Sequence, residues 1–283
     1  MGREKLYFAI GAWGVGNIGD DAIALGLRAV LGDKVRLVGE TVCPSIGTLI
    51  PLEEALACCQ PGDEFMLGGG GTITDENVIR KHFIPIVESA ADRGCPTRIS
   101  RVGFESAADV PPDTLKELLG LCHKITVRSP WSQEFVASLG FASELWPDFA
   151  LSVPGPGERS KKYDVLTVKF GRSGTEELEQ TAIIVEGYVK RDEPLLLLSH
   201  CGKHALNHAL GEATRLKKLA KLYPADLISW AAPETVQEAL EYYAAAYKVI
   251  TARLHGAYLA HVCGVPWEPV PWADLKLQNV YTG

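Results

Sequence analysis

Short apolar runs alternate with longer amphipathic stretches along almost the whole 283-residue chain, and this alternation limits the fold more than any other feature. The runs have the length of buried strands, and the stretches between them carry apolar residues at the three- and four-residue spacing of helices. Strands that alternate with helices form right-handed βαβ units with a parallel sheet. The sequence therefore predicts an α/β protein.

The alternation is interrupted once, at residues 154–162, where Pro, Gly and charged residues follow one another without periodicity. Before this linker we expect strands at 6–11, 35–38, 64–67, 97–102 and 124–128, and helices at 22–31, 51–58, 78–93, 112–121 and 131–139. After it we expect strands at 164–170, 195–200, 227–229 and 248–251, and helices at 175–191, 204–223, 233–243 and 255–262. The sequence predicts two Rossmann-like domains, residues 1–155 and 156–283, that face each other across a ligand-binding cleft.

Charge and composition exclude several classes of protein. The chain has 28 Lys and Arg against 35 Asp and Glu, a net charge of −7, which argues against a nucleic-acid partner. No apolar run approaches the roughly 18 residues of a membrane span, so we do not expect an integral membrane protein. The first residues lack a secretory cleavage pattern and the seven cysteines are scattered, which predicts a cytoplasmic location. A homo-oligomer is compatible with the sequence.

The segment 14–21, GVGNIGDD, follows the first expected strand and opens a helix. Read as G-x-G-x-x-G, with Glu40 as the ribose-binding acid, it is the fingerprint of a dinucleotide site in an NAD(P)-dependent enzyme. However, Asp20 and Asp21 would repel a pyrophosphate. The alternative is a tight turn in which Asp20 caps the helix.

Four glycines, Gly68 to Gly71, follow the third expected strand. Free N–H groups of Gly69, Gly70 and Gly71 could bind an anion, so we expect these residues in the cleft. The alternative is a close crossing of a helix and a strand.

Arginine and histidine side chains gather at expected strand ends. Arg128 precedes a helix that Ser129 caps, and its guanidinium could grip a carboxylate or phosphate in the cleft, or pair with Asp148. Arg253 and His255 are two residues apart before another helix, so a cation and an acid–base group would share one site.

Three further candidates belong to the second half of the chain. His200, Lys169 and Arg172 lie at or near strand ends and are expected to face the cleft. His204 and His208, with His200 or Cys201, leave a zinc site open as an alternative, although no Glu completes a zinc motif.

Taken in order, five motifs resemble the polysaccharide pyruvyl transferase family. They are Gly16-Asn17-Ile18-Gly19-Asp20, Gly68-Gly69-Gly70-Gly71, Val127-Arg128-Ser129 with Ser132, Asp148-Phe149-Ala150, and Arg253-Leu254-His255-Gly256 through Gly264-Val265-Pro266. The resemblance implies a fold similar to the GT-B glycosyltransferases. It also implies transfer of the pyruvyl group of phosphoenolpyruvate onto two hydroxyls of a sugar or glycan, as a cyclic ketal, in cell-surface polysaccharide biosynthesis. Phosphoenolpyruvate would be a co-substrate, with no metal or other cofactor.

The same resemblance implies roles for individual residues. Arg253 and Arg128 would bind the donor, His255 would be the general acid, and the turns with Asn17, Gly19, Asp20, Gly69, Gly70 and Gly71 would shape the cleft. Independently of the resemblance, the negative charge of the donor favours Lys169, Arg172 and His200 as further contacts at strand ends. As a hypothesis, Asp148 or Asp20 would act as the base. Two departures from the family pattern are the stretch 101–106 (RVGFES), in place of a Gly-x-Gly-Pro-like segment, and Ser129, where Asp is common.

Three other functions are compatible with the same residues. A GT-B glycosyltransferase would use a nucleotide sugar as donor, since one fold hosts many chemistries. An NAD(P)-dependent oxidoreductase would use the glycine turn and Glu40. A catalytically silent protein would bind a glycan without turnover.

Overall fold

The computed structural model describes residues 3–40, 42–157, 160–170, 175–201, 209–273, 275–278 and 280. The chain divides into two compact units. The first contains Met1–Gly14 and Ile23–Ser152, and the second contains Val15–Ala22 and Val153–Gln278. The predicted domains 1–155 and 156–283 are each continuous, whereas Val15–Ala22 groups with the second unit because its backbone pairs there. The domain assignment itself stays a prediction.

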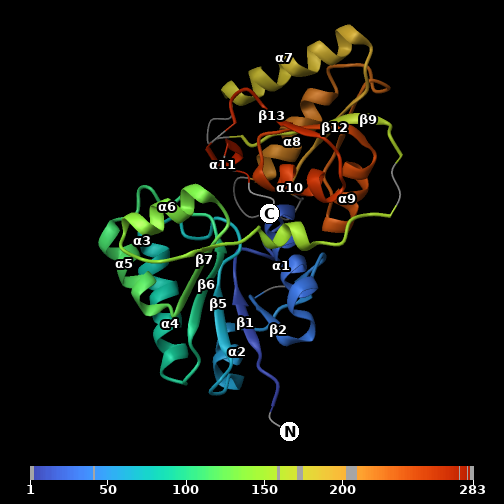
Figure 1. Ribbon diagram of the computed structural model, residues 1–283. Coiled ribbons are helices and arrows are strands. Elements are labelled where there is room, and N and C mark those ends of the chain that lie inside the picture. Colours follow the sequence, from blue (N-terminus) through green and yellow to red (C-terminus); the bar gives the residue numbers. More distant parts are fainter. Residues whose placement is uncertain are drawn as a thin grey trace. The chain divides into compact units, whose positions relative to one another are not determined.

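The first unit is built on a six-stranded parallel sheet with the order β2-β1-β5-β6-β7-β8 (Figure 1). Its strands are β1 Tyr7–Ile10, β2 Val35–Val38, β5 Glu64–Leu67, β6 Thr97–Val102, β7 Lys124–Val127 and β8 Glu144–Leu145. A separate antiparallel hairpin pairs β3 Val42–Cys43 with β4 Gly47–Thr48. All four residues of β5 are buried, as expected for a central strand of a parallel sheet.

Helices cover this sheet and supply most of its apolar partners. They are α1 Ile18–Leu31, α2 Leu52–Cys58, α3 Glu76–Val78, the π-helix η2 Ile79–Phe83, α4 Ile84–Ala91, α5 Pro112–Leu121 and α6 Pro130–Ser138, with short 3-10 turns η1 Gly32–Lys34 and η3 Phe149–Ser152. One core cluster joins Leu67 and Ile99 of the sheet to Leu115 of α5 and Val136 of α6. Ser129 caps α6 as predicted, because its Oγ accepts a hydrogen bond from the Ser132 N–H at 3.2 Å.

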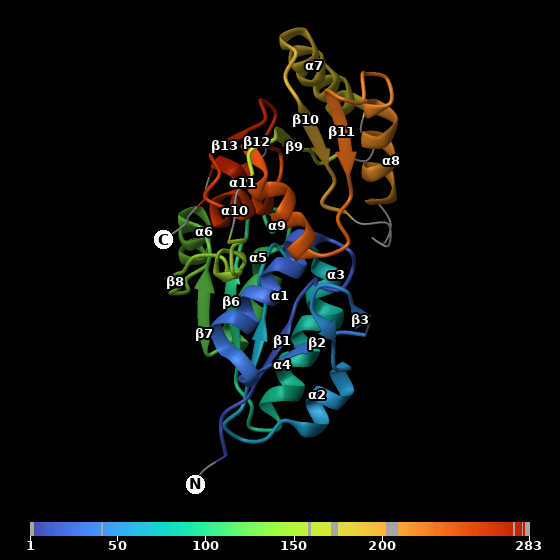
Figure 2. The same cartoon turned by 90° about the vertical axis from the view of Figure 1, so that its right-hand side faces the viewer.

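The second unit has a five-stranded parallel sheet with the order β11-β10-β9-β12-β13, the Rossmann order (Figure 2). Its strands are β9 Tyr163–Thr167, β10 Leu195–Leu198, β11 Ile228–Ala231, β12 Ala246–Thr251 and β13 Trp267–Pro269. Its helices are α7 Thr175–Arg191, α8 Ala209–Ala220, α9 Val236–Ala244, α10 Leu254–Val262 and α11 Leu275–Gln278. The strand order reverses between β9 and β12, and ligands of such sheets bind at the carboxyl ends of the strands beside that reversal.

The predicted α/β class with two Rossmann-like units is confirmed. The hairpin β3–β4 and the short edge strands β8 and β13 were not predicted, because they are too brief for a periodic pattern. The helix expected at 204–223 is described from Ala209 and ends at Ala220. In the described part of the chain, no helix has both the length and the apolar character that a membrane span requires.

Candidate functional site

The candidate site lies where β9 and β12 end in the second unit. Thr167 ends β9 and Thr251 ends β12, and their buried hydroxyls lie 2.7 Å apart. The Thr251 Oγ1 also accepts the N–H of Arg253 at 2.8 Å. A Cβ on Gly256 would come within 2.3 Å of that oxygen. The glycine therefore lets α10 start directly at the strand end, with Arg253 and His255 at its first turn.

Arg253 is held by three groups. Its Nε donates to the Val168 carbonyl at 2.9 Å, and Nη2 pairs with the Glu212 carboxylate and lies 3.4 Å from Cys201 Sγ. Burial by itself lowers the pKa of Arg253, but the neighbouring Glu212 raises it above the ordinary value. The guanidinium is therefore a fixed, permanent cation.

Glu212, on α8, is a buried partner of Arg253 that was not predicted from the sequence. Its Oε1 accepts hydrogen bonds from the Ser199 hydroxyl at 2.9 Å and the His200 N–H at 3.0 Å, while its other oxygen holds Arg253. A signal was present, because Glu212 precedes Leu216 and Leu219 by four and seven residues on the apolar stripe of its helix. A carboxylate on such a stripe is buried, and a buried carboxylate needs a partner.

The turn before α1 packs against the end of β10. Asn17 forms a β-bridge with Cys201, and the Ile18 N–H donates to the His200 carbonyl at 2.9 Å. Asn17 caps the helix, since its Oδ1 accepts the Gly19 N–H at 3.1 Å and its amide donates to Asp20 at 2.6 Å. The expectation that Asp20 is the cap is wrong. The side chain of Asn17 accepts the Gly19 N–H at the start of the helix, whereas Asp20 itself lies within the first helical turn.

These bonds also weaken the dinucleotide interpretation. The N–H groups of Ile18 and Gly19, which would cradle a pyrophosphate, donate to acceptors within the chain. Glu40, the expected ribose-binding acid, is exposed.

Gly19 brings this turn into contact with His255. A Cβ on Gly19 would lie 2.3 Å from Nδ1 of the imidazole, so only glycine permits the approach. The structure therefore brings together Asn17, Gly19, Asp20, Arg253 and His255, five of the predicted site residues. Burial raises the pKa of the adjacent Cys201 thiol to about 11, so at neutral pH it is protonated and is a poor nucleophile.

The side chain of His200, unlike those of Arg253 and His255, is enclosed in the protein interior. Its side chain is fully buried, with Nε2 hydrogen-bonded to the Tyr243 hydroxyl and the two rings edge to face. Burial, followed by the neighbouring Arg253 and His255, lowers the pKa of His200 far below its ordinary value. A neutral, enclosed imidazole favours a structural role over contact with an anionic donor.

Four candidates of this unit remain. Lys169 is exposed beyond β9, while Arg172, His204 and His208 lie outside the described residues. Among the residues that the structure describes, no three His, Cys, Asp or Glu side chains are grouped as metal ligands would be. The expectation of a metal-free site stays a prediction.

In the first unit, Arg128 and Asp148 form a buried ion pair, which is the alternative that the sequence left open. Nη1 of Arg128 lies 2.9 Å from Asp148 Oδ2, and Nη2 lies 3.7 Å from Glu105. Asp148 also accepts the Ala150 N–H at 2.9 Å, and it has no exposed surface. The Ser129 hydroxyl donates to Glu105 at 2.7 Å. The roles of Arg128 and Asp148 in donor binding and base catalysis stay predictions.

The glycine run that ends β5 serves close packing. Gly68, Gly69 and Gly70 have φ of 117°, 87° and 78°, which favour glycine. A Cβ on Gly68 would meet Val102 at 2.1 Å, and one on Gly69 would meet Ile23 at 2.2 Å. The N–H groups of Gly68 and Gly69 donate to the carbonyls of Ile10 and Ser100. The expectation of a free N–H group is therefore wrong at Gly69, and the predicted cleft roles of Gly69, Gly70 and Gly71 stay untested.

A sequence model of the polysaccharide pyruvyl transferases matches residues 17–273. The chain belongs to the polysaccharide pyruvyl transferase family. No curated protein sequence matches it with statistical significance.

Solved structures share the fold of this pyruvyl transferase family member at low sequence identity. A UDP-N-acetylglucosamine 2-epimerase superposes with a TM-score of 0.61 at 10% identity, over 98% of this chain and 81% of its own. The UDP-GlcNAc 2-epimerase of Methanocaldococcus jannaschii gives 0.58 at 14% identity, over 94% and 83%. A functionally uncharacterized protein from Klebsiella pneumoniae gives 0.54 at 15% identity, over 98% and 87%. These likenesses establish a GT-B-like fold.

The two family motifs at opposite ends of the matched region meet in the second unit. The turn 17–20 lies against the ring of His255, and Arg253 is fixed beside it by Glu212. A fixed cation next to an imidazole at a helix N-terminus can bind an anion and exchange a proton with it. The strand reversal of the second unit in this pyruvyl transferase family member therefore brings a fixed guanidinium and an imidazole together, which makes it the candidate site.

Proposed function

We propose that this protein transfers the pyruvyl group of phosphoenolpyruvate to two hydroxyls of a sugar or glycan, forming a cyclic ketal during polysaccharide biosynthesis. The observation that carries the proposal is the contact of Gly19 with His255 beside the fixed guanidinium of Arg253. Phosphoenolpyruvate is a second substrate in this scheme, and the chain's own residues supply the acid, the base and the cation.

Donor binding requires positive charge, because phosphoenolpyruvate carries about three negative charges near neutral pH. Arg253 provides a guanidinium whose orientation is set by the Val168 carbonyl and by Glu212. Its remaining N–H groups can bind the phosphate or the carboxylate of the donor. The first turn of α10 adds the partial positive charge of a helix N-terminus.

His255 is proposed as the general acid. A proton passes from its imidazolium to the methylene carbon of phosphoenolpyruvate, and C2 becomes an oxocarbenium-like centre. A sugar hydroxyl forms a bond to C2 and loses its proton, and the bond from C2 to the phosphate oxygen then breaks. The second hydroxyl attacks C2 and loses its proton, which completes the ketal. One phosphate is released for each pyruvyl group transferred.

Asp20 is favoured over Asp148 as the base that receives a hydroxyl proton. Asp20 is partly exposed and belongs to the turn that contacts His255. Asp148 has no exposed surface, and its carboxylate is bound by Arg128 and by the Ala150 N–H. A carboxylate must reach the hydroxyl it deprotonates, and the greater exposure of Asp20 supports its choice over Asp148.

The test is release of phosphate from phosphoenolpyruvate with a panel of sugar acceptors, read by mass spectrometry for the ~70 Da that a pyruvyl ketal adds. We expect a mass gain with the wild-type protein and none with His255→Ala. His261→Ala is the matched control, because His261 lies exposed on the same helix. A His255→Ala variant that still forms the ketal would remove His255 as the acid.

The GT-B-like fold supports a second candidate, an enzyme that acts on a nucleotide sugar. Solved neighbours include a Staphylococcus aureus protein with UDP and the Methanocaldococcus jannaschii epimerase with UDP-GlcNAc and UDP. Turnover of UDP-GlcNAc without phosphate release from phosphoenolpyruvate would favour this candidate. Ketal formation on UDP-GlcNAc would instead make the nucleotide sugar the acceptor.

A further inference from the structure

Arg101 adopts a backbone conformation that long side chains avoid. Its φ is 52°, and the only other described non-glycine residue with positive φ is Asp192. The residue sits on β6 at an irregularity in the pairing with β7, where its N–H donates to Thr126 Oγ1 at 2.8 Å. Glycine or asparagine would adopt this conformation at lower cost, and such strain is retained mainly where a side chain has a function.

The guanidinium of Arg101 rests on aromatic rings. Its Cζ lies 3.9 Å from the ring centroid of Phe149 and 5.4 Å from that of Trp146. One nitrogen, Nη1, donates to the Pro147 carbonyl at 3.0 Å. The two rings and the Pro147 carbonyl therefore fix the position of the guanidinium, so a ligand that binds it pays little of the entropy of ordering this side chain.

Its charge is not matched by a carboxylate within ion-pair distance among the described residues. Asp148 is the nearby acid, but its carboxylate is engaged by Arg128 and by the Ala150 N–H. Burial lowers the pKa of Arg101, and Asp148 offsets this only in part. A half-buried cation of this kind gains free energy when an oxyanion binds to it.

The neighbouring Trp146 suits a sugar ring. Its side chain is 46% exposed and its Nε1 is anchored to Glu144 at 3.0 Å. Arg101 lies near the carboxyl end of β6, and Trp146 directly follows β8, so both are at the sheet edge where α/β proteins bind ligands. An exposed indole beside a planar cation matches a ring that carries an anionic group.

We infer that Arg101, Trp146 and Phe149 form a subsite for an acidic sugar, whose carboxylate or phosphate binds the Arg101 guanidinium while its ring lies on Trp146. This inference rests on the proposed function and names its acceptor class. The donor is also an oxyanion but has no ring to place on Trp146, so the subsite belongs to the acceptor.

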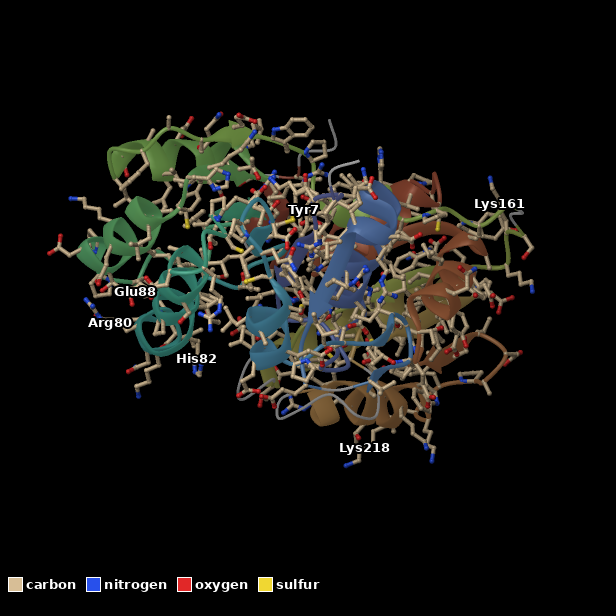
Figure 3. All side chains as sticks on the ribbon, turned by 90° about the horizontal axis from the view of Figure 1, so that it is seen from below. Tyr7, Arg80, His82, Glu88, Lys161 and Lys218 are labelled. Carbon is tan, nitrogen blue, oxygen red and sulfur yellow. The ribbon has the colours of Figure 1, made fainter. Side chains whose placement is uncertain are left out.

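The test measures binding of four probes to the full chain by calorimetry: glucuronic acid, glucose 6-phosphate, glucose and phosphoenolpyruvate. We expect at least one acidic sugar to bind roughly tenfold or more tightly than glucose. Arg101→Asn, which keeps a residue that tolerates positive φ, is expected to abolish this preference, and Arg101→Lys to retain only part of it. The two acidic probes separate a carboxylate from a phosphate. Arg80→Asn is the matched control, since Figure 3 shows Arg80 pointing away from the ribbon.

Three outcomes would overturn the subsite. Arg101→Asn could keep the preference for acidic sugars, the wild type could lack that preference, or the variant could lose binding of phosphoenolpyruvate alone. If Arg101 had only a structural role, Arg101→Asn would lower the melting temperature and leave the binding of all four probes unchanged. Asp192→Gly controls for relief of positive φ and should not alter the binding of any probe.

The subsite and the proposed function are separable. A protein that forms ketals on neutral sugars only would overturn the subsite alone, whereas acidic-sugar binding through Arg101 without phosphate release would overturn the reaction alone.

Discussion

Gly19 and His255 lie so close together that a Cβ on residue 19 would come within 2.3 Å of the imidazole Nδ1. The two residues are far apart in sequence, and each belongs to a family motif. Their contact joins the turn at the start of α1 to the first turn of α10. The position of the proposed acid therefore depends on the absence of a side chain at residue 19.

Gly19→Ala should impair turnover while leaving the protein folded. Alanine is the better helix former by about 1 kcal/mol, but its methyl group would displace the His255 ring. We expect kcat to fall by roughly tenfold or more, because small displacements of a catalytic group are costly. Steady-state kinetics and thermal melting check this. Gly187→Ala is the control, since in α7 the new methyl meets only Arg191 at 3.3 Å. Wild-type kcat in Gly19→Ala would contradict the proposed placement of the acid.

Arg253→Ala should cost both stability and donor affinity. It leaves Glu212 buried without its cation, and breaking such a pair typically costs about 3–5 kcal/mol. Urea unfolding measures that loss, and the KM for phosphoenolpyruvate should rise. The double variant Arg253→Met with Glu212→Gln should recover part of the stability, because no uncompensated charge stays buried and the Gln oxygen can still accept from Ser199 and His200, but it should not recover the KM. A double variant that binds the donor normally would exclude Arg253 from the donor site.

Asp148→Asn separates a structural role from a catalytic one. The asparagine can still accept the Ala150 N–H but no longer pairs with Arg128. We expect a loss of about 3 kcal/mol in the free energy of unfolding and little change in kcat of the folded enzyme. A catalytic base would give the opposite result, a fall in kcat of about 100-fold or more with normal stability.

Stability should fall as the pH falls below about 6.5, the ordinary pKa of histidine. Burial, with the nearby Arg253 and His255, holds the pKa of His200 well below this value in the folded state. Below pH 6.5 the unfolded chain therefore binds a proton at His200 that the folded chain does not bind, and the free energy of unfolding falls. Above pH 6.5 neither state binds this proton, so the contribution of His200 to stability is fully present. Its limiting slope is about 1.4 kcal/mol per pH unit.

Chemical denaturation of wild type and His200→Gln at pH 7.5 and 5.5 measures this contribution. The variant is expected to be less stable at pH 7.5, because it loses the pairing with Tyr243, and to lose less stability on acidification. Equal losses in the two proteins would show that other groups carry the dependence on pH.

Much of the secondary structure follows from local patterns. The strands Val35–Val38 and Glu64–Leu67 and the helices Pro112–Leu121 and Thr175–Arg191 have the bounds that their periodicity predicts. Bounds were missed where a single side chain decides them. Asn17 caps α1 and starts it at Ile18, several residues before the predicted start at residue 22.

Partners of charged residues were less predictable. The pairing of Arg128 with Asp148 was left open against a role in the cleft, and Glu212 was not considered as the partner of Arg253. Glu212 lies 41 residues from Arg253, and only the adjacency of β10, β9 and β12 brings their neighbourhoods together. A sequence pattern shows that a buried charge needs a partner, but not which strand end supplies it.

The sequence by itself determined the α/β class, the two alternating halves, the family and the presence of Arg253 and His255 at a turn from strand to helix. These follow from the spacing of apolar residues and from motifs whose residues are neighbours in the chain. The tertiary structure alone decided that the turn 17–20 meets His255, that Glu212 fixes Arg253 and that the guanidinium of Arg101 lies over the ring of Phe149. The physical reason is that these contacts depend on strand order and on the packing of side chains, which are set by residues distant in sequence.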